Sequence, residues 1–246
     1  MRPEVGTGCT ERVGAPDHPA RTARGRRPQL CHRTVVALII RLLFRTSPRR
    51  DEEGASVNPT DRMPPIPAAD MTVAQRDAVN DYKQVRNTTV FEGPFVPLLR
   101  SPELLSKVQR VGEYLRYRSA LPRHLSELVI LISARHWCQQ FEWGVHSAEA
   151  EKAGLAPLVI EAVADGRRPT GMTNEESTLH DFCVELLRNQ RVSDVTYARA
   201  ADLFGEQGIV DTVGLLGYYS LLAMMMNTAR TPMREGMRPG LERFPV

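Results

Sequence analysis

The 246-residue sequence has few cysteines, few lysines and no long uninterrupted apolar run. Its four cysteines are Cys9, Cys31, Cys138 and Cys183. They form no CxxC pair, so neither a zinc knuckle nor a disulfide framework is predicted. The best apolar run, 35–44, is about ten residues long and broken by an arginine, well short of the roughly 18 needed to cross a bilayer. These absences argue against an integral membrane protein, and we expect the reducing setting of the cytoplasm.

Charge is unevenly distributed along the chain. Residues 1–50 contain 11 arginines and only three acidic residues, whereas residues 51–246 contain 21 basic and 26 acidic residues. A mildly acidic body lacks the basic footprint that nucleic acid requires, so we expect no nucleic-acid partner.

Residues 1–62 form a segment of their own, rich in Arg, Pro, Gly and Thr and without sustained apolar periodicity. Three interpretations are open: a disordered basic arm, an arginine-rich targeting peptide, or an upstream start codon assigned in error, with Met63 or Met71 as the true start. We favour the last, because 29 Arg against 3 Lys indicates a GC-rich coding sequence. The predicted folded domain is therefore 63–246.

From Met71 onward the chain is punctuated as helices, and no segment alternates with period two for long enough to predict a strand. Ser101-Pro102-Glu103 is a helix start, Gly154 a helix stop, and Thr173 to Glu176 a capping box. The expected helices are 101–118, 121–137, 138–153, 156–166, 173 onward, 193–205 and 208–229. The last is apolar on nearly every face, which is typical of a central helix. The predicted fold class is all-α.

Polar residues within these apolar helices are the candidates for chemistry. Glu127 lies inside a run of Leu, Val and Ile, where a charge is costly unless it is paired or faces a cavity. On pattern alone it could equally be an exposed glutamate of an amphipathic helix. Gln139, Glu142 and His146 follow at i, i+3 and i+7, which places them on one helix face. A carboxylate one turn from an imidazole suits proton transfer, although such pairs are often surface features.

The segment RSALPRHLSELVIL (118–131), followed by ARHWCQQFEWGVH (134–146) and AEKAGL (150–155), resembles the carboxymuconolactone decarboxylase family, which includes the alkylhydroperoxidase D-like proteins. The resemblance extends over residues 63–232. It places Glu127, Gln139, Glu142 and His146 at the family's four site positions, and implies a helical domain of the alkylhydroperoxidase D-like type. It also implies a homo-oligomer, a trimer or hexamer, assembled through its helices.

The sequence departs from the peroxide-reducing branch of this family, in which the paired positions are both cysteine. Gln139 and Glu142 stand there instead. Cys138 is a possible redox residue, but it lies one position off the pair, with no resolving partner and no evident cation on its own helix face. The resemblance therefore favours acid–base chemistry on a small, carboxylated or lactone-like substrate, with His146 as general acid/base, Glu142 tuning it and Glu127 relaying or orienting. A peroxiredoxin-type activity, and a non-catalytic oligomer that binds a ligand in the same cavity, remain the alternatives.

Other residues are candidates for substrate binding. Arg135, one turn before Gln139, is favoured over Arg116 and Arg118 as the anchor of a substrate carboxylate. Trp143 could wall an apolar pocket, although filling the core is the commoner role of a tryptophan. Gln139 is a further candidate contact. No third ligand accompanies Glu142 and His146, so we predict neither a metal nor a cofactor.

Overall fold

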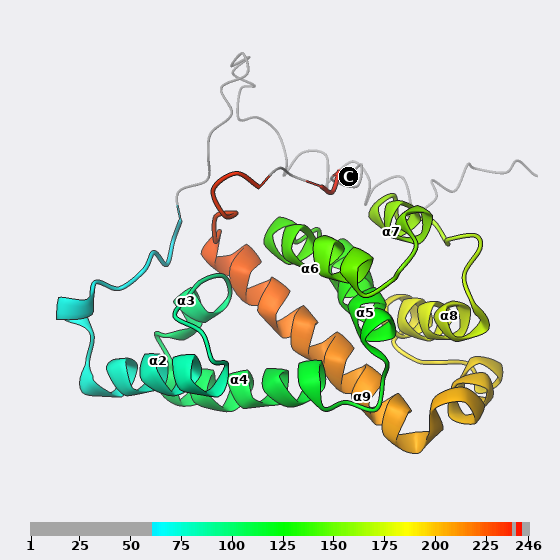
Figure 1. Cartoon of the computed structure of the whole chain (residues 1–246), viewed down its shortest axis with the longest axis horizontal. Coiled ribbons are helices and arrows are strands. Elements are labelled where there is room, and N and C mark those ends of the chain that lie inside the picture. The colour runs from blue at the N-terminus through cyan, green and yellow to red at the C-terminus, as the bar shows by residue number, and fades with distance from the viewer. Residues whose placement is uncertain (1–60, 238–239, 243–246) are drawn as a thin grey trace, which may run out of the picture. The chain divides into compact units, whose positions relative to one another are not determined.

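The computed structural model describes residues 61–237 and 240–242 (Figure 1). The predictions on residues 1–60 lie outside the described residues. Within the described ranges there is no strand, which confirms the all-α fold class. The elements are η1 (Ala68–Asp70), α2 (Val73–Val85), α3 (Phe95–Leu98), α4 (Pro102–Tyr117), α5 (Arg123–His136), α6 (Gln140–Lys152), α7 (Pro157–Ala164), α8 (Asn174–Asn189) and α9 (Asp194–Ala229).

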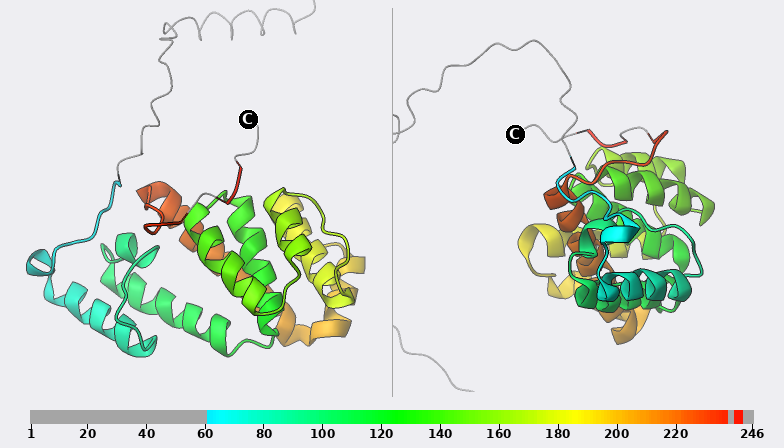
Figure 2. Two further views of the ribbon diagram at one scale, coloured as in Figure 1. Left: turned by 45° about the horizontal axis from the view of Figure 1, so that its top comes forward. Right: turned by 90° about the vertical axis from the view of Figure 1, so that its left-hand side faces the viewer.

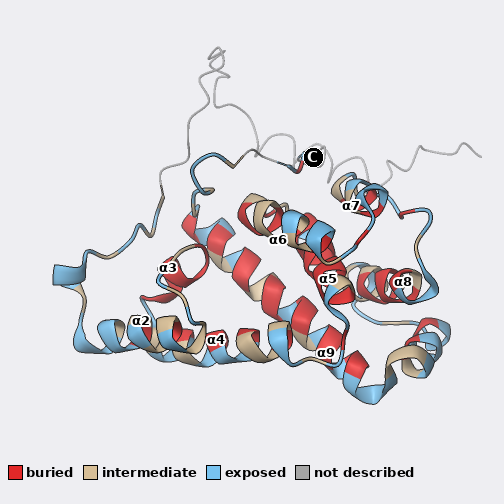
Figure 3. Ribbon diagram, viewed as in Figure 1, coloured by how far each residue is buried: buried red, intermediate tan, exposed pale blue. Residues whose placement is uncertain are grey.

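Helices α5 and α9 form the centre of the bundle. Helix α5 packs against α6, α7, α8 and α9, while α4 packs against both α2 and α9. Figures 1 and 2 show α9 crossing between the α2–α4 pair and the group formed by α5, α6 and α8. Every residue of α5 from Leu125 to Arg135 is buried, and Figure 3 shows the burial concentrated on α5 and α9. A polar side chain on α5 is therefore held in the interior of the domain.

Most helix ends lie where local sequence signals place them. The capping box from Thr173 to Glu176 forms as predicted at the start of α8. Gly154 adopts φ +95° after α6, and the N–H of Leu155 reaches back to the carbonyl of Ala150. This is the Schellman helix stop for which glycine is best suited.

The two helices predicted on either side of residue 205 are both present, and they meet at a kink at Gly205 within the element labelled α9. Gly205 has φ +64° and ψ +179°, outside the helical region, and the chain resumes its helix directly afterwards. At the other end of α9, the backbone N–H of Arg62 donates to the carbonyl of Ala229 over 2.8 Å. Arg62, which the sequence assigned to the N-terminal segment, is thus in contact with the helical domain.

Helix α9 also corrects the expectation that no segment has the composition of a membrane span. It is long and apolar enough for one, by length and mean hydropathy alone, although 56% of its apolar window is buried inside the domain. Buried Asp211 on this helix accepts hydrogen bonds from the Tyr114 hydroxyl and the Ala120 N–H, at 3.1 and 2.8 Å. This packing is that of a core helix, as the all-round apolar pattern predicted.

Candidate functional site

The imidazole of His146 lies between two glutamates where α5 and α6 pack together. Its Nδ1 is 2.7 Å from Oε2 of Glu127, and its Nε2 is 3.4 Å from Oε2 of Glu142. All three side chains are buried, with 3–4% of each residue exposed. The structure therefore brings together the three residues that the sequence analysis proposed as catalytic.

Glu127 makes the shortest contact in this group, with Nδ1 of His146. It is buried, so the interpretation of Glu127 as an exposed glutamate of an amphipathic helix is wrong. When Glu127 is ionised it can only accept this short hydrogen bond, and the proton between the two residues then belongs to Nδ1 of His146. The Nε2 atom is then the one that can accept or release a proton toward Glu142. Arg123 adds a weaker ion pair to the other Glu127 oxygen, at 3.9 Å.

Glu142 stands in the first turn of α6 and lines a cavity, whereas Glu127 does not. Burial raises the pKa of the Glu142 carboxyl above its usual value, and the neighbouring charges of His146 and Arg116 offset this only in part. Glu142 thus holds a proton more readily than an ordinary glutamate. This is the condition that a general acid needs near neutral pH.

The cavity beside His146 has a volume of about 100 Å³ and is walled by residues from α2, α3, α4, α6 and α9. It adjoins a wider and more open cavity of about 630 Å³, with which it shares Tyr82, Arg86, Glu92, Arg116 and Arg234. The smaller cavity is lined by Glu142 and His146, and the wider one is the more open of the two. A small metabolite, rather than a polymer, fits these dimensions.

Three arginines line this cavity, and they differ in what already holds them. Arg86 stacks over the Phe95 ring, 4.7 Å from its centroid, and Arg234 pairs with Glu92. Arg116 lies 5.5 Å from the Tyr117 ring centroid, and no carboxylate among the described residues is within ion-pair distance of it. Arg116 is therefore the arginine best placed to bind an anionic ligand group at this site.

Two neighbouring tyrosines, Tyr218 and Tyr219, complete the wall, and the sequence analysis missed both. The Tyr219 ring meets the His146 ring edge-on, with 5.0 Å between centroids. Burial raises the pKa of Tyr219 well above its usual value and that of Tyr218 to about 12, so both remain neutral phenols. The two tyrosines are adjacent in the sequence, but their position beside the α6 histidine depends on how α9 packs against α6, which no local sequence pattern shows.

Three residues predicted to bind substrate lie away from this cavity. The amide of Gln139 is occupied, because its oxygen accepts from the Phe141 N–H at 2.7 Å and its nitrogen donates to Asn227 at 2.8 Å. Trp143 belongs to the hydrophobic core. Arg135 donates to a backbone carbonyl near the C-terminus and lines a different cavity. The structure thus brings Arg116, and not the favoured Arg135, to the acid–base group.

Cys138 and Gln139 precede α6 and are not part of it, contrary to the helix predicted from 138. Cys138 has φ +48°, and the N–H of Gln139 bonds to the carbonyl of Ala134, so Cys138 occupies the left-handed position of a helix stop. Its Sγ lies 3.8 Å from Nη1 of Arg135. The expectation concerned a cation on the helix face of Cys138 itself; this cationic neighbour comes instead from α5. Cys183 is buried, and burial raises the pKa of its thiol.

Among the described residues, no three His, Cys, Asp or Glu side chains are arranged to hold a metal ion. No family model matches the chain, and no curated protein matches it. Among solved structures, one match is an uncharacterized peroxidase-related protein from Ralstonia eutropha JMP134, described as an alkylhydroperoxidase AhpD core. The match has a TM-score of 0.58 and 14% identity, over 71% of this chain and 92% of that chain. This likeness shows that the chain has the alkylhydroperoxidase D-like fold.

Proposed function

We propose that the chain is an enzyme of the carboxymuconolactone decarboxylase type, which uses acid–base chemistry on a small carboxylated or lactone substrate. The observation that carries the proposal is the placement of His146 between two buried glutamates, one of which faces a cavity lined by arginines. A structural role alone would not require three ionisable side chains to be buried together, because each must be desolvated.

The proposed reaction needs a proton at carbon. Loss of CO₂ breaks a carbon–carbon bond, and its electron pair stays on the substrate, where a proton must be delivered. Glu142 faces the cavity and holds a proton readily, so it acts as the acid. In the proposed cycle, water in the cavity supplies the replacement proton, His146 takes it up at Nε2 and passes it to Glu142, and Glu127 stabilises the imidazolium formed in between.

Substrate orientation is assigned to the arginines. Arg116 binds a carboxylate that the reaction retains, since an arginine can hold a carboxylate by two parallel hydrogen bonds. The Arg234–Glu92 pair stands at the shared wall of the two cavities, where it can limit the size of the substrate.

The test is a turnover assay on a panel of small carboxylated lactones and unsaturated acids, with CO₂ release as the readout. We expect His146→Ala and Glu142→Gln to lower kcat by about 10²- to 10⁴-fold, the contribution of a positioned acid or base. Arg116→Gln should raise KM more than it lowers kcat. Cys138→Ser is the matched control at the same helix junction and should stay within a few-fold of wild type.

One observation favours a second candidate, peroxide reduction by a single cysteine. The Sγ of Cys138 lies 3.8 Å from Nη1 of Arg135. In this candidate reaction the Cys138 sulfur attacks a hydroperoxide to give a sulfenic acid and an alcohol, and an external dithiol then reduces the sulfenic acid. Hydroperoxide consumption with a dithiol reductant tests this. If Cys138→Ser is inactive while His146→Ala is not, the acid–base proposal is refuted. If no substrate turns over but a panel compound binds with an affinity that Arg116→Gln weakens, the alternative of a non-catalytic ligand-binding protein is favoured.

A further inference from the structure

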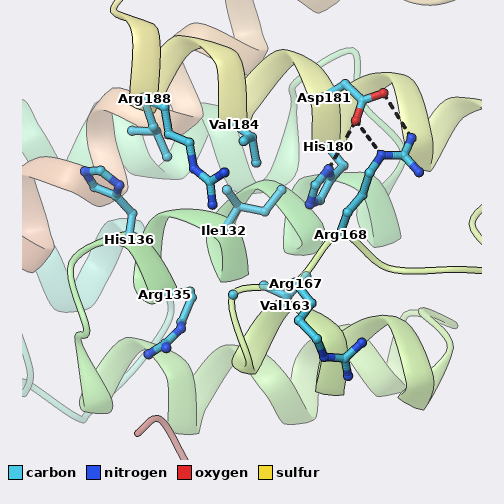
Figure 4. Close-up of a pocket in the computed structure, with 12 residues that line it drawn as sticks. Ile132, Arg135, His136, Val163, Arg167, Arg168, His180, Asp181, Val184 and Arg188 are labelled. Atoms are coloured by element: carbon cyan, nitrogen blue, oxygen red, sulfur yellow. Dashed lines mark hydrogen bonds and ion pairs between the residues drawn. The ribbon is translucent and has the colours of Figure 1, made fainter. Parts of the chain in front are cut away.

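A second cavity, of about 270 Å³, lies on the other side of α5 and shares no lining residue with the cavity at His146. It is bounded by the end of α5, the end of α7 with the loop that follows, and α8 (Figure 4). Its volume equals that of about nine water molecules in the liquid, enough for a compact metabolite. No step of the proposed reaction uses this cavity.

The lining is strongly basic. Its cationic and imidazole residues are Arg135, Arg167, Arg168, Arg188, His136 and His180. One carboxylate, Asp181, faces them. Residues 51–246 contain more acidic than basic side chains, so this cavity concentrates positive charge against the balance of the domain. Such an arrangement attracts anions and focuses them into the hollow.

The arginines differ in how far their charge is already neutralised. Arg167 pairs with Asp165 at 2.7 Å, and Arg168 makes two bonds to Asp181, at 2.9 and 3.0 Å. For Arg188, no carboxylate among the described residues is within ion-pair distance. Figure 4 shows its guanidinium extending toward Ile132 over the hollow. Arg188 therefore brings an uncompensated positive charge to the cavity.

Two imidazoles flank Arg188. Burial lowers the pKa of both His136 and His180, and the positive charge of Arg188 lowers each of them further. Both rings are therefore neutral at pH 7, and each offers one N–H donor. His180 is buried at the floor, with its Nδ1 3.4 Å from Asp181, while His136 lies at the exposed rim. An oxyanion beside Arg188 would therefore have a second donor in His136 at the rim, because the single N–H of neutral His180 is directed to Asp181.

The rest of the lining is apolar, which decides what kind of anion fits. The side chains of Ile132, Val163, Val184 and Leu187 line the same hollow. Inorganic phosphate or sulfate alone would leave this surface against water. We propose that the cavity binds a small organic anion, whose carboxylate or phosphate group contacts Arg188 and whose compact apolar body lies on these four side chains.

The experiment measures the binding of phenyl phosphate and of benzoate to the full chain by isothermal titration calorimetry, with benzyl alcohol as the uncharged probe and inorganic phosphate as the headgroup alone. We expect one or both aromatic anions to bind, and to bind more tightly than inorganic phosphate. We expect no binding of benzyl alcohol. The tighter of the two anions identifies whether a phosphate or a carboxylate is preferred.

Three variants locate the binding. Arg188→Gln should weaken the affinity of the bound anion by about tenfold or more, the value of a hydrogen bond to a charged group. Arg191→Gln removes the same charge three residues away, outside the cavity lining, and should leave the affinity unchanged. Arg188 is exposed, so its substitution should not unfold the chain. Arg116→Gln, in the cavity at His146, should likewise leave the affinity unchanged if the anion binds beside Arg188.

The proposal is overturned if wild type binds none of the anions at millimolar concentration, if Arg188→Gln binds as well as wild type, or if only Arg116→Gln weakens binding. An equal loss in Arg188→Gln and Arg191→Gln would show general charge attraction, and would also overturn it. A loss confined to Arg188→Gln supports it, whatever the outcome of the decarboxylation assay.

Discussion

Glu142→Gln should raise the stability of the protein while it removes the activity. Glutamine has nearly the shape of glutamate and cannot ionise, so the substitution isolates the charge. The Glu142 residue is 4% exposed, and the nearest ionisable group to its carboxylate is the His146 ring, whose Nε2 lies 3.4 Å away. The interactions of the buried carboxylate with its neighbours do not offset the free energy lost when it leaves water, so its ionised form destabilises the fold.

The pH dependence follows from the direction of the shift. In the folded chain the pKa of Glu142 lies above its usual value, so between the unfolded and folded pKa values the folded state binds more protons than the unfolded state. Stability therefore falls as pH rises through that window, and the full cost persists above it. Each unit of the shift costs about 1.4 kcal/mol, which is about 3–6 °C in Tm for a domain of this size.

Differential scanning calorimetry of wild type and Glu142→Gln from about pH 4 to pH 8 measures this cost. We expect a higher Tm for the variant at neutral pH and convergence of the two curves as pH falls toward the usual pKa of a glutamate. Glu161→Gln, an exposed carboxylate on α7, is the control and should change little. A variant no more stable than wild type at pH 7, or more stable by the same amount at every pH, would refute the argument that a buried charge stands at Glu142.

Three further predictions concern the fold and its assembly. A chain that begins at Met63 should melt within a few degrees of the full chain, and a larger fall in a calorimetric scan would show that residues 1–62 are packed. Light scattering should find a homo-oligomer, and Val213→Glu, on an exposed apolar position of α9, should dissociate it; a monomeric wild type would contradict this. Gly112→Ala should cost about 1–3 kcal/mol in urea unfolding, because its new methyl group meets the Tyr218 hydroxyl, whereas Gly217→Ala meets open space and should gain about 0.5–1 kcal/mol; equal effects would contradict the packing.

Local sequence signals predicted most of the fold because helix ends depend on residues close together in the chain. The Thr173–Glu176 box and the glycine at 154 end or begin helices within a residue of the predicted places. The helix stop at Cys138 is of the same kind as the one at Gly154, but it could not be predicted, because glycine normally occupies this left-handed position. The predicted helix therefore began two residues too early.

The choice between arginines could not be made from sequence, because it depends on which helices meet. Arg135 is one turn from Gln139 in the sequence, but the helix stop at Cys138 separates the two residues, and Arg135, on α5, lines another cavity. Arg116 is distant from His146 in sequence and reaches the cavity through the packing of α4 on α9. Proximity along a chain predicts neighbours only within one helix, and this cavity is walled by five.

The contacts of Glu127 and Glu142 with His146 also could not be ranked from sequence, and they suggest an order for the proton transfers. The one-turn spacing of Glu142 and His146 predicted their pairing, yet the shorter bond comes from Glu127, across the α5–α6 contact. Each imidazole nitrogen therefore meets a different carboxylate. Because Glu142 alone of these two carboxylates lines the cavity, a proton that reaches a ligand must pass through Glu142 or His146 Nε2. Glu127→Gln should then slow the recharging of Glu142 without changing ligand affinity, whereas Glu142→Gln abolishes delivery itself. A solvent isotope effect on kcat that rises in Glu127→Gln, with KM unchanged, is the expected result, and a raised KM would instead place Glu127 in contact with the substrate.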